Sequence, residues 1–276
     1  MRALTWVSSY PRSGCDWTRV LVASYLLDVP APDLDTDEAD RVAPDLMDLF
    51  NHGRMVPRGD DRPYLVKTQF HPGVEALRPY REATGKVVCL VRDPRGVISS
   101  HVRAQRLAGE ERRWLALWMV EQLAPVGRPS QDAGISGASG TWLQHVRDWT
   151  SAERVRRHFP HVEDVCVVRF EDLRRDPAAA LRVVLEFLDV AGGVDADRVR
   201  RTVERSALRD ILAAARRAPA RGLAAFQDNP PPVVEVDDAE LSLMDIGEDV
   251  EAAYRKRLAE ERELAALVRQ FGYEAG

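Results

Sequence analysis

The sequence predicts an α/β protein whose central parallel sheet is flanked by helices. Three observations predict this class: short apolar runs alternate with amphipathic segments, one run is almost unbroken in β-branched residues, and turn residues separate the runs. Strands that alternate with helices are typical of parallel sheets covered on both faces. Since the 276 residues show no internal repeat and no strong linker, we predict one domain over residues 1–276.

The chain opens with a strand, a loop and a helix. Residues 4–9, LTWVSS, form an apolar run that ends in small polar residues, which predicts a buried strand. Pro11 and Gly14 interrupt the pattern in the following segment, YPRSG. Apolar residues then recur at helical spacing through 16–28, so we predict a helix there. Residues 29–61, rich in Asp and Pro, predict irregular cover with one helix.

Two further strands and another helix start follow. YLVKT at 64–68 predicts the second strand, and 73–85 predicts a short helix. KVVCLVR at 86–92 is typical of a strand buried on both faces, because nearly all its residues are apolar. Asp93 and Pro94 suit the N-cap and the first position of the next helix.

Helical patterns dominate the second half of the chain. A fourth strand with its exit, DVCVVRFEDL, is predicted at 164–173. The Gly/Ser-rich segment 126–140 predicts a loop, either a lid over a site or a plain surface loop, and 218–237 is predicted to be irregular. The helical segments are predicted at 107–125, 141–159, 177–190, 196–217 and 246–272.

Composition argues against several classes of protein. The formal net charge is −5, and charged residues of mixed sign make up 30%, so we expect no nucleic-acid partner. No apolar run reaches the ~18–20 residues that cross a bilayer, so we expect no membrane partner. The N-terminus lacks a basic-then-apolar leader, and we therefore expect a cytoplasmic location.

The cysteines and histidines do not predict a metal site or disulfides. The three cysteines are an odd number without ligand-like spacing, and Cys89 and Cys166 are expected in the core. Four histidines lie in polar helical or loop segments, and we expect their side chains to be exposed to solvent: His101, His145, His158 and His161.

The segment 8–19 leaves a predicted strand and opens a predicted helix. Backbone N–H groups at a helix start lack partners and carry the positive end of the helix dipole, so a phosphate or sulfate can bind there. Gly14 lets the backbone approach closely, Arg12 adds charge and Ser13 adds a donor. Trp17 could stack on a base. An ordinary strand–helix turn with a core Trp also fits, because the full Walker spacing is missing.

The segment 87–100, VVCLVRDPRGVISS, repeats this design. Its strand ends in Arg92, and Ser100 lies eight residues further on, two turns into the next helix. The alternative is that Arg92 pairs with Asp93 or another carboxylate and that Ser100 is simply exposed.

These two segments, followed by VVRFEDLRRDPAAALRVVLEFLDV and with TWLQHVRDWT before the fourth strand, resemble the sulfotransferase family over most of the chain. The resemblance implies a P-loop-like α/β fold. It also implies an enzyme that uses 3′-phosphoadenosine 5′-phosphosulfate (PAPS) as sulfo donor and needs no metal. YREATGKVVCLVRDPR and the ending DVEAAYRKRL…FGYE are similar to bacterial tailoring enzymes that sulfate glycopeptide antibiotics. The implied partner is a small-molecule acceptor.

The resemblance assigns the 5′-phosphosulfate loop to Arg12, Ser13, Gly14 and Cys15. Most members carry Lys at the position of Arg12. Trp17 matches the residue that stacks on adenine.

The same resemblance extends to the later strands. Arg92 and Ser100 match the pair that holds the 3′-phosphate, and Lys67 matches the Lys of a KTH motif next to the sulfo group. Phe170 occupies the usual Tyr of a YEDL motif.

The proton acceptor departs from the family pattern. Gln69 stands where the family has its catalytic His, and a neutral amide cannot take the acceptor's proton. His71 points to the same side if the strand continues, but Pro72 favours an end of the strand. Asp16 replaces a Thr that commonly donates to the phosphosulfate; it could repel the donor, serve as the base, or simply favour the helix dipole.

The family's basic Gly-rich loop is also missing. No Lys or Arg occurs from Asp228 to Asp249, although Arg216, Arg217 and Arg221 precede this stretch. Fewer cations should weaken the binding of a doubly charged phosphate.

Three hypotheses follow. The first is PAPS-dependent sulfation of a hydroxyl on a small natural product, with Arg12 and Lys67 neutralising charge and Asp16 or His71 as base. The second is a repurposed member that binds a substrate already carrying a sulfate or phosphate ester and expels it by ring closure or elimination. The third is a non-catalytic subunit of an active homologue. The acceptor and the oligomeric state stay open; a homodimer and a heterodimer with a paralogue are both considered.

Overall fold

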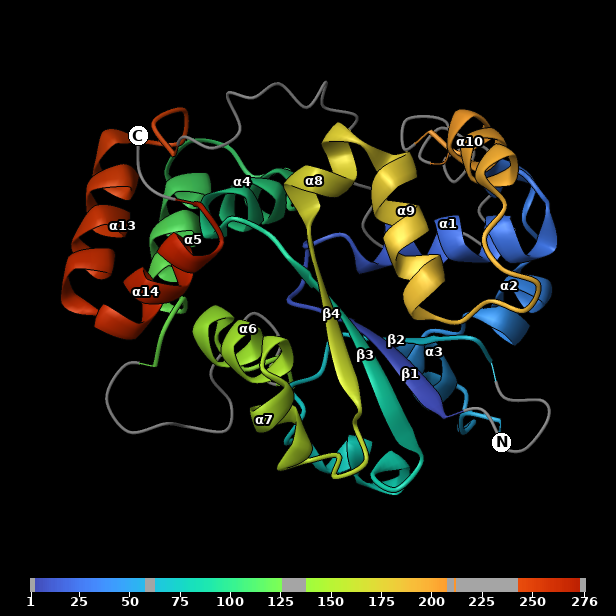
Figure 1. The fold of residues 1–276 in the computed structure, drawn as a ribbon. Helices are drawn as coiled ribbons and strands as arrows, with labels where there is room; N and C mark the ends of the chain where they lie inside the picture. Colours follow the sequence, from blue (N-terminus) through green and yellow to red (C-terminus); the bar gives the residue numbers. More distant parts are fainter. Residues whose placement is uncertain (1–2, 58–62, 126–137, 208–210, 212–242, 274–276) are drawn as a thin grey trace.

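A four-stranded sheet lies at the centre of the computed structural model, which describes residues 3–57, 63–125, 138–207, 211 and 243–273 (Figure 1). The strand order is β2-β1-β3-β4, and each neighbouring pair is parallel. The strands are β1 (Leu4–Ser9), β2 (Val66–Thr68), β3 (Thr84–Val91) and β4 (Asp164–Arg169). The predicted α/β class with a parallel sheet is confirmed.

Alternate residues of the central strands face two separate hydrophobic cores. Trp6 and Val87 belong to one cluster, whereas Val7 and Val88 belong to the other. All four side chains are fully buried. Because successive side chains of a strand point to opposite faces, these apolar runs place β1 and β3 between two layers of helices.

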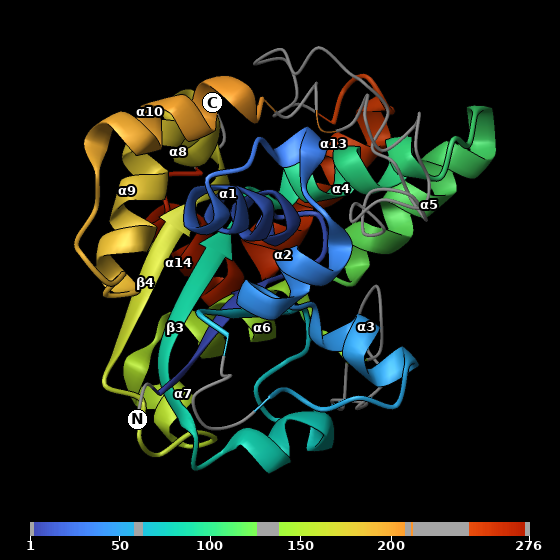
Figure 2. The same cartoon turned by 90° about the vertical axis from the view of Figure 1, so that its right-hand side faces the viewer.

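One layer covers the face that carries Val7. It contains α1 (Cys15–Leu27), α2 (Thr36–Val42), α9 (Pro177–Phe187) and α10 (Ala196–Arg205), which face the viewer in Figure 2. The short helix α8 (Phe170–Arg175) follows β4 directly and packs with this layer.

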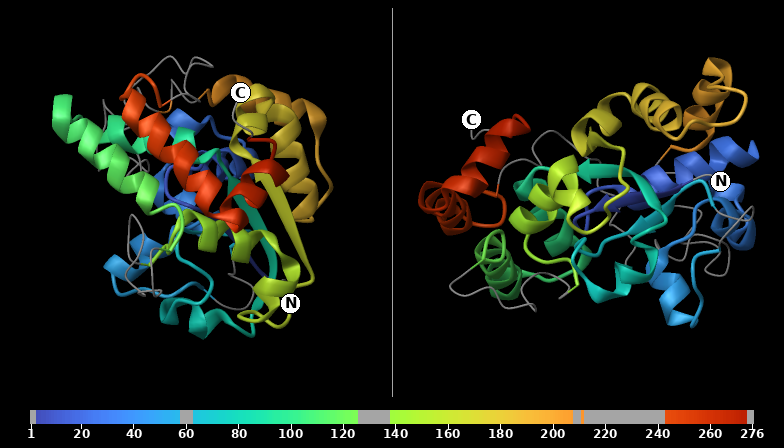
Figure 3. Two further views of the ribbon diagram at one scale, coloured as in Figure 1. Left: turned by 90° about the vertical axis from the view of Figure 1, so that its left-hand side faces the viewer. Right: turned by 60° about the horizontal axis from the view of Figure 1, so that its bottom comes forward.

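The second layer covers the face that carries Trp6. Its helices are α3 (Leu46–Asn51), α4 (Pro94–Ala104), α5 (Gly109–Glu121), α6 (Trp142–Thr150), α7 (Ala152–Arg156), α13 (Glu248–Glu260) and α14 (Arg262–Gln270). The two C-terminal helices, drawn in red, lie on the side of the sheet away from α9 and α10 (Figure 3).

Three predicted segments differ in detail from the structure. Residues 29–61 hold the helices α2 and α3 and the 3₁₀ turn η1 (Ala31–Asp33) where one helix was expected. The helix predicted at 73–85 is a 3₁₀ helix, η3 (Glu75–Tyr80); in an α-helix the ring of Pro79 would clash with the carbonyl of Glu75, four residues earlier. The helix predicted at 141–159 is interrupted at Ser151, which caps α7.

Other predictions can be compared directly with side-chain burial. Cys89 is fully buried as expected, and Cys166 is half-buried. The prediction for His145 is wrong, because this side chain is fully buried between Ser8 and Ser139. No described helix has the length and apolarity needed to cross a membrane. The predicted irregular segment 218–237 and most of the predicted loop 126–140 lie outside the described residues.

Candidate active site

The two predicted anion-binding loops form a single site. β1 and β3 are neighbours, so the loops at their carboxyl ends lie side by side. Arg92 Nη1 donates to the backbone oxygen of Arg12 at 2.8 Å. The Arg12 guanidinium in turn reaches Ser100, with Nε 3.2 Å from Oγ. The structure therefore brings together Arg92 and two side chains, Arg12 and Ser100, that are 88 residues apart in the sequence.

Local backbone geometry explains the residue types in the first loop. Arg12 has a φ of 70° and Gly14 a φ of 101°, both in the left-handed region. A Cβ at Gly14 would lie 2.6 Å from Cδ2 of Phe170, so a side chain there would meet the ring. The same Phe170 ring lies 4.2 Å from the Arg92 guanidinium carbon. Phe170 therefore packs against both loops, and only glycine fits opposite it.

Three buried polar side-chain atoms in this loop and in the first turn of α1 make no hydrogen bond to the described residues. Asp16 Oδ1 is ion-paired with Lys67, and the other two, Ser13 Oγ and Trp17 Nε1, are potential donors. Both side chains are buried, Ser13 at 0% and Trp17 at 7% exposure. Unsatisfied buried donors are costly, so their presence at the start of a 13-residue helix suits an anionic ligand. The residues present therefore fit a phosphosulfate group at this end of the site.

Three side chains hold the end of β3 by hydrogen bonds. Trp142 Nε1 donates to the backbone oxygen of Arg92 at 3.2 Å, and the Asp93 N–H donates to Glu171 Oε1 at 3.1 Å. Tyr273 Oη lies 2.7 Å from Glu171 Oε2 and 3.2 Å from the Val91 oxygen. Asp93 pairs with Arg95 at 2.8 Å. Asp93, one of the partners considered for Arg92 from the sequence, is therefore paired with another arginine.

Charges of both signs act on Arg12. Burial lowers the pKa of Arg12, Asp16 counteracts this, and Arg103 adds to it. An arginine still stays charged at neutral pH. Burial and the Arg12 charge lower the pKa of His101 to about 4, so this imidazole is neutral near pH 7. Cys15 does not act as a thiolate here, because burial raises its pKa to about 12.

Lys67, in the short strand β2, lies between two carboxylates. Its Nζ is 2.6 Å from Asp16 Oδ1 and 2.6 Å from Asp45 Oδ2. Burial by itself lowers the pKa of Lys67, but Asp16 and Asp45 together raise it above its ordinary value. Lys67 is therefore a permanent cation. Gln69 turns its amide toward Cys15 Sγ at 3.7 Å.

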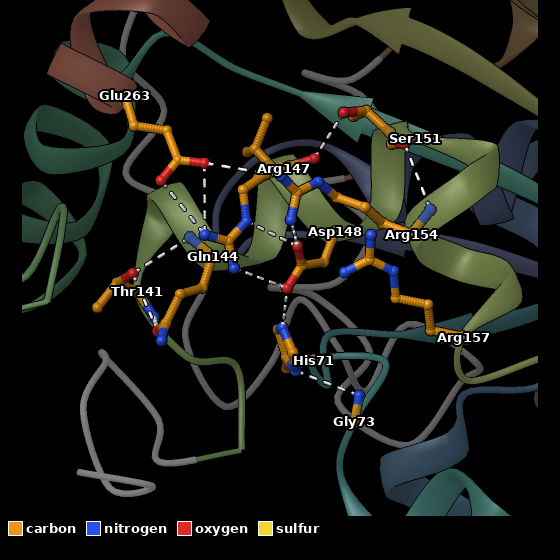
Figure 4. A network of polar contacts seen from close by, with 12 residues as sticks. His71, Gly73, Thr141, Gln144, Arg147, Asp148, Ser151, Arg154, Arg157 and Glu263 are labelled. Atoms are coloured by element: carbon orange, nitrogen blue, oxygen red, sulfur yellow. Dashed lines mark hydrogen bonds and ion pairs between the residues drawn. The ribbon is translucent and has the colours of Figure 1, made fainter. Parts of the chain in front are cut away.

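His71 belongs to a different polar network, shown in Figure 4. Its Nε2 lies 2.9 Å from Asp148 Oδ2, and its Nδ1 accepts from the Gly73 N–H at 3.2 Å. Asp148 is also paired with Arg147 Nε at 2.7 Å. With both ring nitrogens engaged, His71 has no lone pair ready for an acceptor's proton. Of the two candidate bases, the structure places only Asp16 against Lys67.

Asp45 and Asp148 were missed by the sequence reasoning. Asp45 precedes the short apolar pattern LMDLF, so its role as N-cap of α3 had a local signal. Its contact with Lys67 joins residues 22 apart, and no local signal indicates it. The loss of the family's basic loop concerns Arg216, Arg217, Arg221 and the stretch from Asp228 to Asp249. All of these except residues 243–249 lie outside the described residues.

Comparison with known proteins agrees with this geometry. The sulfotransferase domain model matches residues 3–211, well over half of the chain. The comparison with curated protein sequences gives no match. A mouse sulfotransferase, SULT7A1, solved with PAP (the desulfated product of PAPS) is 12% identical and superposes with a TM-score of 0.60, over 100% of this chain and 90% of the other.

Two structures of retinol dehydratase are similar as well. The complex with androsterone and PAP is 16% identical with a TM-score of 0.50, over 92% of this chain and 80% of the other. The complex with retinol and PAP is 16% identical with a TM-score of 0.51, over 93% and 81%. These likenesses show the fold, and the domain match shows the family. The chain belongs to the sulfotransferase family and is a sulfotransferase-like enzyme.

Proposed function

We propose that this protein transfers a sulfo group from PAPS to a hydroxyl of a small natural-product acceptor. The single observation that carries this proposal is the convergence of Arg12, Arg92 and Ser100 at the ends of two neighbouring strands. Two guanidinium groups and a hydroxyl, next to a helix start, suit a ligand with two separated anionic groups.

Each end of the nucleotide has its own group of residues. Arg12, Ser13 and the start of α1 would hold the phosphosulfate, and Arg92 with Ser100 would hold the 3′-phosphate. Trp17 and Phe170 are two of the aromatic residues beside these loops, and the family resemblance suggests Trp17 for the adenine. When bound, the donor supplies a sulfo group already activated by its bond to a phosphate.

The chain's own residues account for the transfer step. The acceptor oxygen forms a bond to sulfur, its proton passes to the Asp16 carboxylate, and the bond between sulfur and the phosphate oxygen breaks with its electron pair on PAP. Arg12 and Lys67 neutralise charge on the bridging and sulfo oxygens. We assign the base to Asp16 because both nitrogens of His71 are engaged.

Calorimetric titration with PAP tests the proposal. We expect wild-type protein to bind PAP, and Arg12→Ala to bind at least ~10-fold more weakly, because a hydrogen bond to a charged group contributes about 1.5–3 kcal/mol. Arg182→Ala is the matched control, since Arg182 is exposed on α9. The absence of heat from wild-type protein at millimolar PAP would contradict the proposal.

The surroundings of Lys67 favour one second candidate. Asp16 and Asp45 offset its charge, which lowers the attraction for an external donor. The protein would instead expel a sulfate or phosphate ester from its own substrate, with Asp16 as base and Arg12 on the leaving group. In favour of such chemistry, a protein of the same fold is named a dehydratase. Release of sulfate from a sulfated substrate without PAPS would distinguish the two candidates.

A further inference from the structure

The two carboxylates at Lys67 differ in how firmly they are held. Asp45 is the more buried, with its side chain 5% exposed. Its Oδ1 accepts from the Met47 N–H at 2.9 Å while its Oδ2 contacts Lys67. The backbones of Asp45 and Lys67 are also bridged, and the Lys67 N–H donates to the Pro44 oxygen at 2.9 Å. Asp45 is therefore fixed relative to Lys67 through its backbone and both carboxylate oxygens.

Asp16 is the looser partner of Lys67. It lies in the first turn of α1, and its side chain is 27% exposed. Its ion pair with Lys67 runs through Oδ1. Its charge also raises the pKa of Arg12, so Asp16 acts on both cations assigned to the phosphosulfate. An anion that enters between these cations meets Asp16 as a like charge in a partly buried site, where repulsion is poorly screened.

We propose that Asp45 is a positioning residue that fixes the Lys67 ammonium, and that the sulfo group of a bound donor displaces Asp16 from it. This inference rests on the proposed function. Lys67 keeps one carboxylate in either state, so its ammonium stays in place while the second contact changes. Asp16 becomes available to an acceptor hydroxyl only after the donor is present, and productive binding is ordered, donor first.

The proton balance agrees with this order. Before donor binding, the Asp16 carboxylate is neutralised by Lys67. After displacement it keeps its negative charge without that cation, and it takes the proton of the acceptor hydroxyl as the new oxygen–sulfur bond forms. The bond between sulfur and the donor phosphate breaks in the same step, and PAP carries away the electron pair.

Two isosteric substitutions separate the roles of the carboxylates. Asp45→Asn keeps an oxygen for the Met47 N–H and remains a good N-cap, so α3 is retained while the charge is lost. Asp16→Asn removes the looser charge. In calorimetry, we expect Asp16→Asn to tighten PAPS relative to PAP by ~10-fold, since the sulfo group no longer displaces a carboxylate. Asp45→Asn should leave the affinity for PAPS relative to PAP unchanged or lower it.

Turnover adds a readout that separates binding from chemistry. Asp16→Asn should lose transfer although PAPS binds more tightly, and Asp45→Asn should lower kcat without a rise in KM for PAPS. The proposed displacement of Asp16 would be overturned if the affinity for PAPS relative to PAP changed equally in the two variants. Sulfo transfer by Asp16→Asn at the wild-type rate would overturn it as well.

A measurement without nucleotide tests the fixed contact by itself. The chain has only three lysines, so pH-dependent acetylation followed by mass spectrometry reports on each. Lys86, paired with Asp189 at 3.0 Å, and the exposed Lys256 serve as internal references. Near pH 9, Asp45→Asn should raise Lys67 acetylation ~10-fold, the effect of one pKa unit.

The outcomes keep the two proposals apart. If wild-type protein binds neither PAP nor PAPS, the proposed function fails, while the acetylation series still tests Asp45. If the nucleotides bind but Lys67 is equally protected in wild-type and Asp45→Asn proteins, the positioning role fails and the proposed function stands.

Discussion

Gly14 shows how one residue type permits the geometry of the anion loop. Its left-handed backbone brings α1 to the end of β1, and the space where a Cβ would lie is filled by Phe170. Arg12 adopts a left-handed φ as well, which is uncommon for a residue with a side chain and is found at functional sites. The loop therefore holds its guanidinium at Ser100 through an uncommon backbone conformation.

Replacement of Gly14 by alanine tests both constraints at once. We expect Gly14→Ala to lower the free energy of unfolding by more than the about 1–3 kcal/mol of a strained φ, because the methyl group also meets the Phe170 ring. Gly192→Ala is the control: its φ is 85°, but nothing lies within 4 Å of the added Cβ. Denaturation of both variants gives the difference, and equal losses would contradict the contact.

The site residues that the sequence predicted lie in recognisable local patterns. Those that it missed depend on contacts between segments that are distant in the sequence. Arg12, Arg92 and Ser100 were predicted because each loop joins a recognisable strand to a recognisable helix, and parallel strands gather such loops at one edge. Asp45 was missed because its ion pair with Lys67 depends on how α3 lies against β2. His71 was considered a base because Asp148, its partner 77 residues away, could not be foreseen.

At the scale of elements, aspartates set the starts of many helices. Asp35, Asp45, Asp93, Asp176 and Asp195 each accept a hydrogen bond from the first turn of the helix that follows. This explains why the Asp-rich segment 29–61 holds two helices where one was predicted. Pro79, by contrast, is a local signal for a turn or 3₁₀ segment, and we interpreted its surroundings as a helix.

The cap of α4 should be worth more than an exposed one. Asp93 is fully buried and also pairs with Arg95, whereas Asp176 caps α9 at the surface. We expect Asp176→Ala to cost about 1 kcal/mol, and Asp93→Ala about 3–5 kcal/mol because it leaves Arg95 buried without its carboxylate. Urea denaturation of the two variants measures this; similar costs would mean that the ion pair adds little.

For the whole molecule, one buried and one half-buried histidine link folding to pH. Burial lowers the pKa of His145 to about 3 and that of His101 to about 4. Because the unfolded chain binds these protons at a higher pH, stability from His145 is complete above about pH 6.5 and is lost as the pH falls toward about 3. Polar neighbours in sequence suggested solvent around His145, but its helix packs this face onto β1.

Unfolding measured between pH 7 and pH 4 tests this link. We expect the free energy of unfolding to fall with pH, by up to about 1.4 kcal/mol per pH unit for each histidine that protonates only on unfolding. His145→Asn should flatten the slope, and His161→Asn, on an exposed residue, should leave it unchanged. Parallel slopes for all three proteins would show that His145 does not contribute.

The contacts that support the end of β3 include a residue outside the part of the chain that the family model matches. The matched domain ends at residue 211, yet Tyr273 contacts Glu171 and Val91 beside the strand end from which Arg92 emerges. A protein shortened to its recognisable domain would keep every residue proposed to touch the nucleotide and would still lose a support of the arginine's backbone. The residues that the family model matches are therefore not all of the residues that support this candidate active site.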